Sequence, residues 1–423
     1  MNDNKISKNS IVAKFAVPIS FLILFFLAAN FTDCDLVTFW KRRSHLTDLV
    51  VDMIPPDFSY IQKILLPLFY TIQMSVTGTV LGIFFALVLS PFGAANLGFP
   101  AVIRRILRIV IQILRSFPAL ILALTATFLF GLGTFAGTFA ITLYTFAIMT
   151  KLTYEDASAA DVKAYQALRA MGVSKYVAYI HGILPEIIPG FLTNALYLLE
   201  TNVRHSSILG YVGAGGIGLL LNEKISWLEY DKVGTILLML FLTVCVIEYF
   251  SRYLAALIRK ERTIKKEQAR LLLLFLAALF LICTFTLSLP DFSRTSPQTL
   301  RNMFAGFLQP DWSFFFSAEK DGLGYLLLET VCIAFIGTVI GAIVSAPLAF
   351  LNTKRFVPAP VSFLFNLVIM VIRSVPFLVY GLIFIRVSGP GAFTGVLTLA
   401  VCSIGLLTKR FTEALDALDP RPY

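Results

Sequence analysis

Residues Ala164–Pro185 read AYQALRAMGVSKYVAYIHGILP, and this run is the longest polar interruption between two apolar segments that has a clear internal design. A first helix carries small or apolar residues at three- and four-residue spacing, and Gly172 suits the left-handed position that ends it. Ser174 can cap a second short helix, which Gly182 and Pro185 terminate. The segment is either a projecting surface that another protein binds or a cytoplasmic connector that binds no partner. The stripe of the first helix comprises Ala157, Ala160, Ala164, Ala167, Leu168 and Met171.

The composition is that of a membrane protein. Of 423 residues, 57% are hydrophobic and only 14% are charged, and the mean hydropathy is +0.81. A soluble protein would be nearer a quarter charged. So little chain lies outside the apolar blocks that a soluble catalytic domain is excluded, and no nucleophile–base pair predicts a catalytic residue. The five cysteines show neither disulfide nor metal-ligand spacing, so we expect no metal and no other cofactor.

The apolar blocks are long enough to span hydrocarbon, which takes about 20 residues, and they predict an all-α, polytopic fold of about ten transmembrane helices. The first block could be a signal peptide, but it lacks a convincing cleavage site and many spans follow, which favours an uncleaved span. The predicted spans lie near residues 15–31, 64–92, 117–132, 134–150, 187–208, 233–251, 271–290, 323–351, 375–388 and 391–408.

Basic residues are concentrated in alternate loops. Residues 93–116, 252–270 and 352–374 are rich in Lys and Arg, whereas residues 31–63 and 291–322 each carry more acids than bases. The positive-inside rule therefore places both termini in the cytoplasm, together with residues 164–185. Because the placement of the +10 net charge follows topology, we expect no nucleic-acid partner.

An internal repeat relates two parts of the chain at an offset of 258–259 residues. TIQMSVTGTVLG (71–82) matches TVCIAFIGTVIG (330–341), and RSFP (115–118) matches RSVP (373–376). Small residues in spans could reflect helix packing alone, but three blocks in one register favour a true repeat. The third block pairs Gly133, Phe135, Gly137, Thr150, Lys151 and Glu155 with Gly391, Phe393, Gly395, Thr408, Lys409 and Glu413, and Asp161 and Tyr165 with Asp419 and Tyr423.

The repeat predicts four parts of the chain. An N-terminal span and an external loop occupy residues 1–59, and a complete core occupies 60–253 with the helix–glycine–helix segment at 155–185. A basic cytoplasmic linker follows at 254–270. The second core, 271–423, is incomplete, because it stops where the first continues into QALRAMG.

Two motifs resemble a known family. Gln166-Ala-Leu-Arg-Ala-Met-Gly172, followed by Leu184-Pro185, resembles the coupling loop of ABC-importer permeases. The run NVRHSSILGYVGAGGIG (202–218), together with the two RSxP segments, resembles the phosphonate-transport permeases of bacteria. The resemblance covers residues 60–423, and it departs from the family in two places: Gln166 stands where the family has glutamate, and a second coupling loop is missing. A neutral amide loses any ion pair with a basic residue of the ATPase.

The resemblance implies a permease subunit in the bacterial cytoplasmic (inner) membrane, with an ABC-importer permease-like fold in two copies. It implies an ABC ATPase subunit on the cytoplasmic side, an external or periplasmic solute-binding protein, and a second permease chain or a homodimer. The solute would be a small anion, most simply phosphonate, or phosphate or phosphite. The implied ATPase-coupling residues are Gln166, Ala167, Arg169, Gly172, Leu184 and Pro185.

The glycine run also satisfies the dinucleotide fingerprint G-x-G-x-x-G, which requires a preceding strand in a soluble βαβ unit. Between membrane spans, close helix packing or a flexible outer gate fits it better. Arg204 either pairs with Glu200 or lends positive potential to an anion path. Arg115 and Arg373 either reach to headgroups or act at a gate. The path or gate candidates are therefore Arg115, Glu200, Arg204, Arg373, Gly213, Gly215, Gly216 and Gly218.

Other functions are compatible with the sequence. An ion-gradient-driven secondary transporter would place ionisable groups or broken helices at the membrane midplane. A permease for another small solute, such as an amino acid, and a non-transporting assembly subunit are further alternatives. For the second copy, either the missing part is encoded on a separate polypeptide, or the first copy pairs with itself in a dimer.

Overall fold

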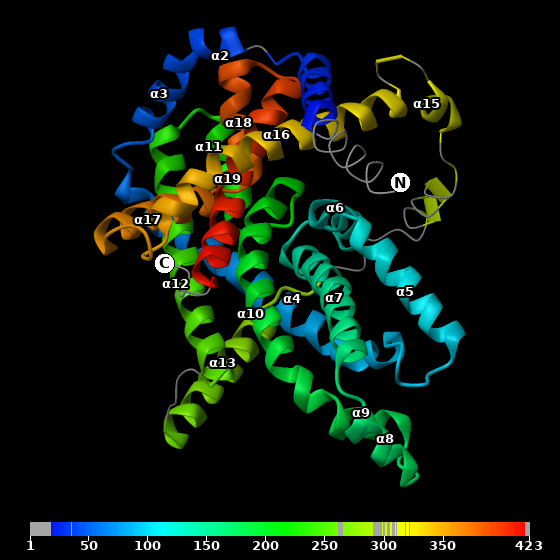
Figure 1. Ribbon diagram of the computed structural model, residues 1–423. Helices are drawn as coiled ribbons and strands as arrows, with labels where there is room; N and C mark the ends of the chain where they lie inside the picture. Colours follow the sequence, from blue (N-terminus) through cyan, green and yellow to red (C-terminus); the bar gives the residue numbers. More distant parts are fainter. Residues whose placement is uncertain are drawn as a thin grey trace, which may run out of the picture. The chain divides into compact units, whose positions relative to one another are not determined.

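The computed structural model describes residues 18–34, 36–260, 265–290, 298, 301–302, 305–306, 309, 311–317, 319–320 and 322–418 (Figure 1). All regular secondary structure in these residues is helical, which confirms the predicted all-α class. Among the described residues, six helices are long and apolar enough to cross a membrane, and up to nine spans result if each of three bent helix pairs crosses once. A further apolar helix, Pro18–Phe31, is shorter in the part that the structure describes, and the fold is polytopic.

The helices form two compact units, each described by itself. The first-copy unit, residues 55–304, holds α4 (Ile61–Gly93), α5 (Ala101–Ser116), α6 (Ala119–Phe130), α7 (Thr134–Ala159), α8 (Lys163–Ala170), α9 (Lys175–Gly182), α10 (Leu184–Leu209), α11 (Ile217–Ser226), α12 (Tyr230–Ile258) and α13 (Lys266–Phe285). The second-copy unit, residues 1–54 with 305–423, holds an N-terminal helix (Pro18–Phe31), α2 (Leu36–Lys41), α3 (Arg43–Asp52), α15 (Trp312–Phe316), α16 (Leu323–Asn352), α17 (Ala359–Ser374), α18 (Phe377–Ser388) and α19 (Ala392–Asp416).

Two predicted spans are parts of bent helix pairs. The segments predicted at 117–132 and 375–388 are the 12-residue helices α6 and α18, about 18 Å long at 1.5 Å per residue. Each is the second half of a bent pair, α5–α6 at 94° and α17–α18 at 87°. The predicted basic loop 93–116 is largely the helix α5. Phe117 and Val375 are extended because each precedes a proline, and this conformation ends the first helix of each pair.

The internal repeat recurs in backbone geometry. Gly133 and Gly391 precede α7 and α19 with φ of 142° and 148°, a region that side chains other than glycine rarely enter. The offset changes from 259 to 258 because α4 and α5 are joined by seven residues, 94–100, whereas α16 and α17 are joined by six, 353–358. The two copies therefore share one helical framework.

Glycines set how closely the first and last helices of each framework approach. A Cβ added at Gly78 would lie 2.8 Å from the Cβ of Ile141 in α7, and one added at Gly337 would lie 2.7 Å from the Cβ of Leu399 in α19. Leu399 is the repeat counterpart of Ile141, so α4–α7 and α16–α19 pack in the same register. Inside a membrane, burying apolar surface against protein instead of lipid gives no hydrophobic gain, so helices associate by close packing, which small residues allow.

The helix that precedes each copy in sequence packs on the other copy. In the first-copy unit, the Gln73 side-chain amide of α4 donates to the Cys283 carbonyl oxygen at 3.1 Å and to Thr286 Oγ1 at 2.8 Å, at the end of α13. In the second-copy unit, Ala28 of the N-terminal helix is buried against Ile336 and Val396. The compact units therefore do not follow the order of the sequence.

Candidate functional site

The helix–glycine–helix segment forms as predicted, with corrected limits. α8 ends at Ala170, Gly172 follows with φ of 85°, and the Ser174 hydroxyl accepts from Val177 N at the start of α9. Figure 1 shows α8 and α9 together at the ends of α7 and α10. Pro185 opens α10 in its first turn instead of terminating α9. The sequence stripe from Ala157 to Met171 was wrong as one helix, because α7 ends at Ala159 and α8 begins at Lys163.

The α8–α9 pair is anchored to the connection between α4 and α5. Tyr165 is 5% exposed, and its hydroxyl donates to the Leu97 carbonyl oxygen at 2.6 Å. Burial raises the pKa of Tyr165, so its hydroxyl remains a donor at neutral pH. The Lys175 ammonium donates to the Gly98 carbonyl oxygen, and Asn96 Nδ2 donates to the Ala157 carbonyl oxygen at 2.9 Å. The connection 94–100 is thus bonded to α7, α8 and α9.

The predicted coupling residues lie together on this pair and at the start of α10. Gln166 and Ala167 are exposed, whereas the Arg169 guanidinium donates to the Val173 carbonyl oxygen within the turn. Met171 and Val177, which the motif did not single out, expose 73% and 43% of their surface. This apolar exposure beside a compact core is visible only in the folded arrangement.

The glycine run lies in a crowded turn between α10 and α11. Ile217 N donates to the Thr71 hydroxyl of α4 at 2.8 Å. A Cβ at Gly218 would lie 1.9 Å from the Ser207 carbonyl oxygen, and one at Gly216 would lie 2.7 Å from Thr71 Oγ1. Because the element before the run is the helix α10 and not a strand, a dinucleotide-binding turn does not fit.

The remaining predicted glycines have backbone roles. Gly213 is left-handed with φ of 83°, and its carbonyl oxygen accepts from Gly133 N at 3.0 Å. Gly215 has φ of 78°, and a Cβ there would lie 3.5 Å from Thr134 Cγ2. At Gly213 and Gly215 the positive φ, and not a close backbone contact, is what favours glycine.

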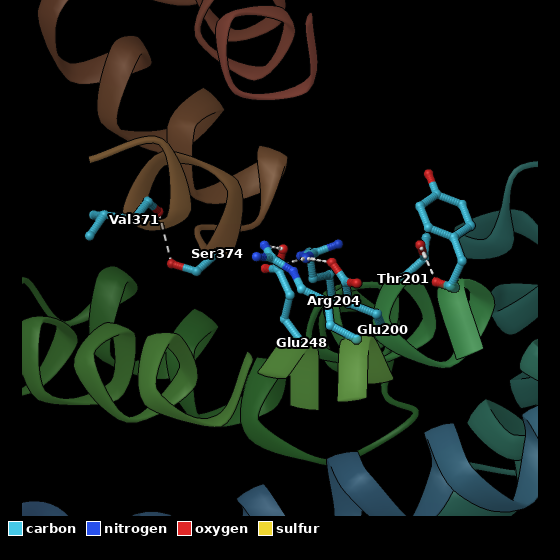
Figure 2. A network of polar contacts seen from close by, with 8 residues as sticks. Glu200, Thr201, Arg204, Glu248, Val371 and Ser374 are labelled. Atoms are coloured by element: carbon cyan, nitrogen blue, oxygen red, sulfur yellow. Dashed lines mark hydrogen bonds and ion pairs between the residues drawn. The ribbon is translucent and has the colours of Figure 1, made fainter. Parts of the chain in front are cut away.

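Arg204 lies between two carboxylates (Figure 2). Its guanidinium donates to Glu200 one turn earlier in α10, and Glu248 Oε2 of α12 lies 4.0 Å away. Glu248 also accepts from Arg252. The predicted Glu200–Arg204 pair is present, and Glu248, which also pairs with Arg252, lies beside it. The spacing rule for one helix could not reveal this second carboxylate. A role of Arg204 in an anion path requires these pairs to open.

Arg115 and Arg373 occupy the last turns of α5 and α17. Arg115 is exposed, while the Arg373 stem packs on α19, where a Cβ at Gly405 would lie 2.8 Å from Arg373 Cγ. Both residues adjoin the bend of a broken helix pair, a place where backbone angles can change.

A second polar cluster lies at the opposite end of α4 from the helix pair. The buried Lys224 of α11 is 2.9 Å from Glu229 and 3.0 Å from Glu223, and its ammonium lies 4.3 Å from the centre of the Trp227 ring. Glu229 also pairs with Lys232 of α12 at 2.7 Å. These two lysines hold the pKa of Glu229 below its ordinary value. The cluster ties α11 to the start of α12.

We expect Glu229→Gln to lower the melting temperature near neutral pH and to have less effect in acid. A carboxylate with a depressed pKa stabilises the fold above its unfolded pKa, and this contribution is lost as pH falls through the folded value. Melting curves of the wild type and the variant should therefore begin to approach each other below about pH 4, the ordinary carboxylate pKa, and should meet only below the lowered pKa of folded Glu229. Glu155→Gln, which removes an exposed pair with Lys151, is the control and should change little. A constant gap at all pH values would contradict the assignment.

The structure thus defines a multi-pass membrane protein that carries a compact helix pair at the ends of its spans. The model of the family "Binding-protein-dependent transport system inner membrane component" matches residues 78–263, which include α7 to α12. The phosphite transport system permease protein PtxC of Stutzerimonas stutzeri is 31% identical over 217 residues, covering 51% of this chain and 79% of that protein. The chain belongs to this family of inner-membrane components.

Two further similarities extend the comparison. The phosphate-import permease protein PhnE of Mycolicibacterium smegmatis is 25% identical over 386 residues, covering 89% of this chain and 71% of that protein. A chain of the MetNI methionine ABC transporter, solved in inward-facing conformations, is 20% identical with a TM-score of 0.43, covering 48% of this chain and 99% of that chain.

Proposed function

We propose that the chain is the transmembrane subunit of an ATP-driven importer that carries a small phosphorus oxyanion, either a phosphonate or phosphate or phosphite, across the bacterial cytoplasmic membrane. Family membership and the names of the relatives support this solute class. ATP hydrolysis takes place on a separate ABC ATPase subunit. An external or periplasmic solute-binding protein delivers the solute.

The observation that carries the proposal is the α8–α9 pair. Its inner side is buried against the ends of α4 and α7, with Tyr165, Ala178 and Tyr179 at most 5% exposed. Its outer side presents Met171 and Val177, and an ATPase groove would bury these apolar groups. In this arrangement Arg169 shapes the turn, while Gln166 and Ala167 contact the ATPase directly.

The basic residues support an orientation with this pair in the cytoplasm. The connection 94–100, which the pair contacts, leads into α5 with Arg104, Arg105 and Arg108. Positive residues favour the cytoplasmic side. Both termini then also lie in the cytoplasm, and the Lys224–Glu229 cluster lies on the outer side.

We propose that two features move during translocation. They are the bends of the two broken helix pairs, which carry Arg115 and Arg373, and the glycine turn. Arg204 would attract the anion only in a conformation that separates it from Glu200 and Glu248. The path also requires a second core, supplied by another permease chain or a second copy of this one.

Purification and uptake together test the function. A tagged chain co-expressed with the ATPase and binding protein of its operon should retain the ATPase in detergent, and proteoliposomes should take up phosphonate only with internal ATP. Failure to retain an ATPase with or without nucleotide would overturn the proposal. Uptake that survives ATP depletion but stops when the proton gradient is dissipated would instead indicate a secondary transporter.

We expect Tyr165→Phe to retain the ATPase but to lower the amount of solute transported per ATP hydrolysed. The ring still packs, whereas the bond to the Leu97 carbonyl oxygen is lost, so α8–α9 is less firmly attached to the α4–α5 connection. A lost hydrogen bond costs about 1 kcal/mol, so the amount of solute transported per ATP should fall roughly fivefold.

The control for this experiment is Lys163→Ala, at the start of the same helix in an exposed pair with Asp161. It should leave the transport-to-hydrolysis ratio unchanged. An unchanged ratio in Tyr165→Phe, or equal losses in both variants, would contradict a transmitting role for Tyr165.

A further inference from the structure

One side of α10 carries polar side chains that stay partly exposed. Tyr197, Thr201, Arg204 and His205 recur at three- and four-residue spacing, so they lie along one side of the helix. Tyr197 exposes 41% of its surface, and the other three residues are half-buried. Polar groups in a membrane span face protein or water and not lipid, so this side of α10 lines a polar space.

Another side of α10 holds the helix in place. Asn202 Nδ2 donates to Thr79 Oγ1 and to Thr145 Oγ1, at 2.8 Å each, and Ser206 Oγ lies 2.8 Å from Ser75 Oγ. All five residues are buried. Interhelical hydrogen bonds of this kind join helices inside a membrane. The partly exposed side therefore faces away from α4.

Tyr144 of α7 borders the partly exposed side. The ring centres of Tyr144 and His205 lie 5.1 Å apart with their planes at 74°, and Tyr197 is within electrostatic range of Tyr144. The Tyr144 hydroxyl forms no hydrogen bond within the described residues, and His205 Nδ1 is buried without a partner. Because buried polar atoms are normally paired, this ring nitrogen indicates a place for a ligand or water.

Arg115 supplies a positive charge to the same region. It is within electrostatic range of Tyr144, and it forms no hydrogen bond or ion pair with the residues that the structure describes. The helices α5 and α6 contain no acidic residue. Arg204, by contrast, already contacts Glu200 and Glu248. The charge of Arg115 is therefore the one that an anion can use without breaking an ion pair.

The position of Tyr144 along α7 gives the depth of this cluster. Tyr144 follows the first residue of α7, Thr134, by ten residues and precedes the last, Ala159, by fifteen. At about 1.5 Å per residue, these stretches are about 15 Å and about 22 Å long. Because the hydrocarbon core is about 30 Å thick, Tyr144 lies near its middle. Polar and ionisable groups at this depth are typical of a solute path.

The second copy lacks this arrangement in the part that the structure describes. Cys402 stands at the repeat position of Tyr144, at the offset of 258. The neighbouring Tyr380 donates its hydroxyl hydrogen to the Ile372 carbonyl oxygen at 3.0 Å, and the stem of Arg373 packs on α19. The tyrosine hydroxyl beside the second bend is therefore used inside the protein, whereas Tyr144 keeps its hydroxyl for a ligand.

We propose that Tyr144, Tyr197, His205 and Arg115 form a solute-binding position near the middle of the membrane, and that it takes a tetrahedral phosphorus oxyanion. The Arg115 guanidinium pairs with the anionic charge, and the two tyrosine hydroxyls and the imidazole N–H donate to its oxygens. The proposal rests on the proposed function, because it names the place in this chain where the transported anion is held.

Cysteine labelling of the full importer in its native membrane tests the charge and the accessibility of this position. A Thr201→Cys thiol lies one helical turn from both Tyr197 and His205, and it should react faster with a negatively charged methanethiosulfonate than with a positively charged one. Labelling of the five native cysteines, measured on the chain without this change, is subtracted.

Two arginine variants separate a local charge from the general field of the protein. Arg115→Gln should lower the preference for the negative reagent about tenfold. Arg105→Gln, which changes another exposed arginine of α5, should leave it unchanged. An unreactive thiol at position 201 would place this side of α10 in lipid or protein and overturn the proposal. A preference that survives Arg115→Gln would do so as well.

Protection from labelling tests binding itself. Methylphosphonate or inorganic phosphate should slow the reaction at position 201, whereas methylammonium should not. Tyr144→Phe keeps the ring against His205 but loses the hydroxyl, so the same protection should need about fivefold more anion. Protection by neither anion, or equal protection in Tyr144→Phe, would contradict the site.

The labelling needs no ATP hydrolysis, so its outcome is independent of the coupling to the ATPase. Protection in a chain that never retains the ATPase would refute the importer and keep the anion site. Retention of the ATPase without protection would refute the site alone.

Discussion

Replacing Met171 by glutamate is expected to abolish stable association of the chain with its ATPase. Met171 is 73% exposed at the turn between α8 and α9, where it makes the most prominent apolar surface of the pair. A carboxylate there would lose its water in an apolar groove without a partner. Loss of a central contact costs at least about 2 kcal/mol, or roughly thirtyfold in affinity, and an unpaired buried charge adds to it.

The measurement is the amount of ATPase retained by the tagged chain and the rate of uptake in proteoliposomes. Both should fall to background in Met171→Glu. Met171→Leu keeps an apolar side chain of similar volume and serves as the matched control, with retention close to the wild type. Normal retention in Met171→Glu would remove the α8–α9 turn from the ATPase contact and with it the main support for the proposed coupling surface.

Gly218→Ala is expected to be the most damaging single methyl addition in the glycine run. Gly218 lies in the first turn of α11, where alanine is intrinsically favoured over glycine by about 1 kcal/mol. A Cβ there would nevertheless lie 1.9 Å from the Ser207 carbonyl oxygen, which belongs to the backbone of α10 and cannot rotate away. The expected loss is about 3 kcal/mol or more, at the upper end of ordinary overpacking.

A melting curve in detergent measures this effect. The control is Leu219→Ala, the next residue, which is 52% exposed and should change stability by less than about 1 kcal/mol. Because alanine improves the helix at both positions, a large loss only at Gly218 isolates the close approach of α10 and α11. Equal, small changes would show that the turn can open to accept a side chain.

Much of the framework follows from local chemistry that a sequence displays. Gly172, with an N-cap serine two residues later, predicts α8 and α9 because these residues act within one turn of the chain. The two RSxP segments mark equivalent positions, and both end a helix for the same steric reason. Apolar length alone, however, counts α6 and α18 as spans, because it cannot distinguish a full crossing from half of a bent pair.

The missed features depend on contacts between distant residues. Glu248 lies 48 positions after Glu200, and only the packing of α10 on α12 brings it to Arg204. Likewise, the apolar spacing in the sequence does not indicate that Met171 is exposed while Tyr165 is buried. The reason is that the chain breaks at residues 160–162, so α8 does not continue the orientation of α7. The sequence motif therefore predicts a coupling segment, and the fold decides which of its side chains are exposed.

The helix that precedes each copy in sequence packs on the other copy, and this arrangement decides which part of the protein a deletion would damage. Removing residues 1–54 takes away the helix that packs on Ile336 and Val396, so this deletion would destabilise the second copy. A cut just before α13 has the converse effect, because it separates Gln73 of the first repeat from Cys283 and Thr286. The duplicated gene segment and the folded body are different units, and neither half of the coding sequence is a module that can be transplanted by itself.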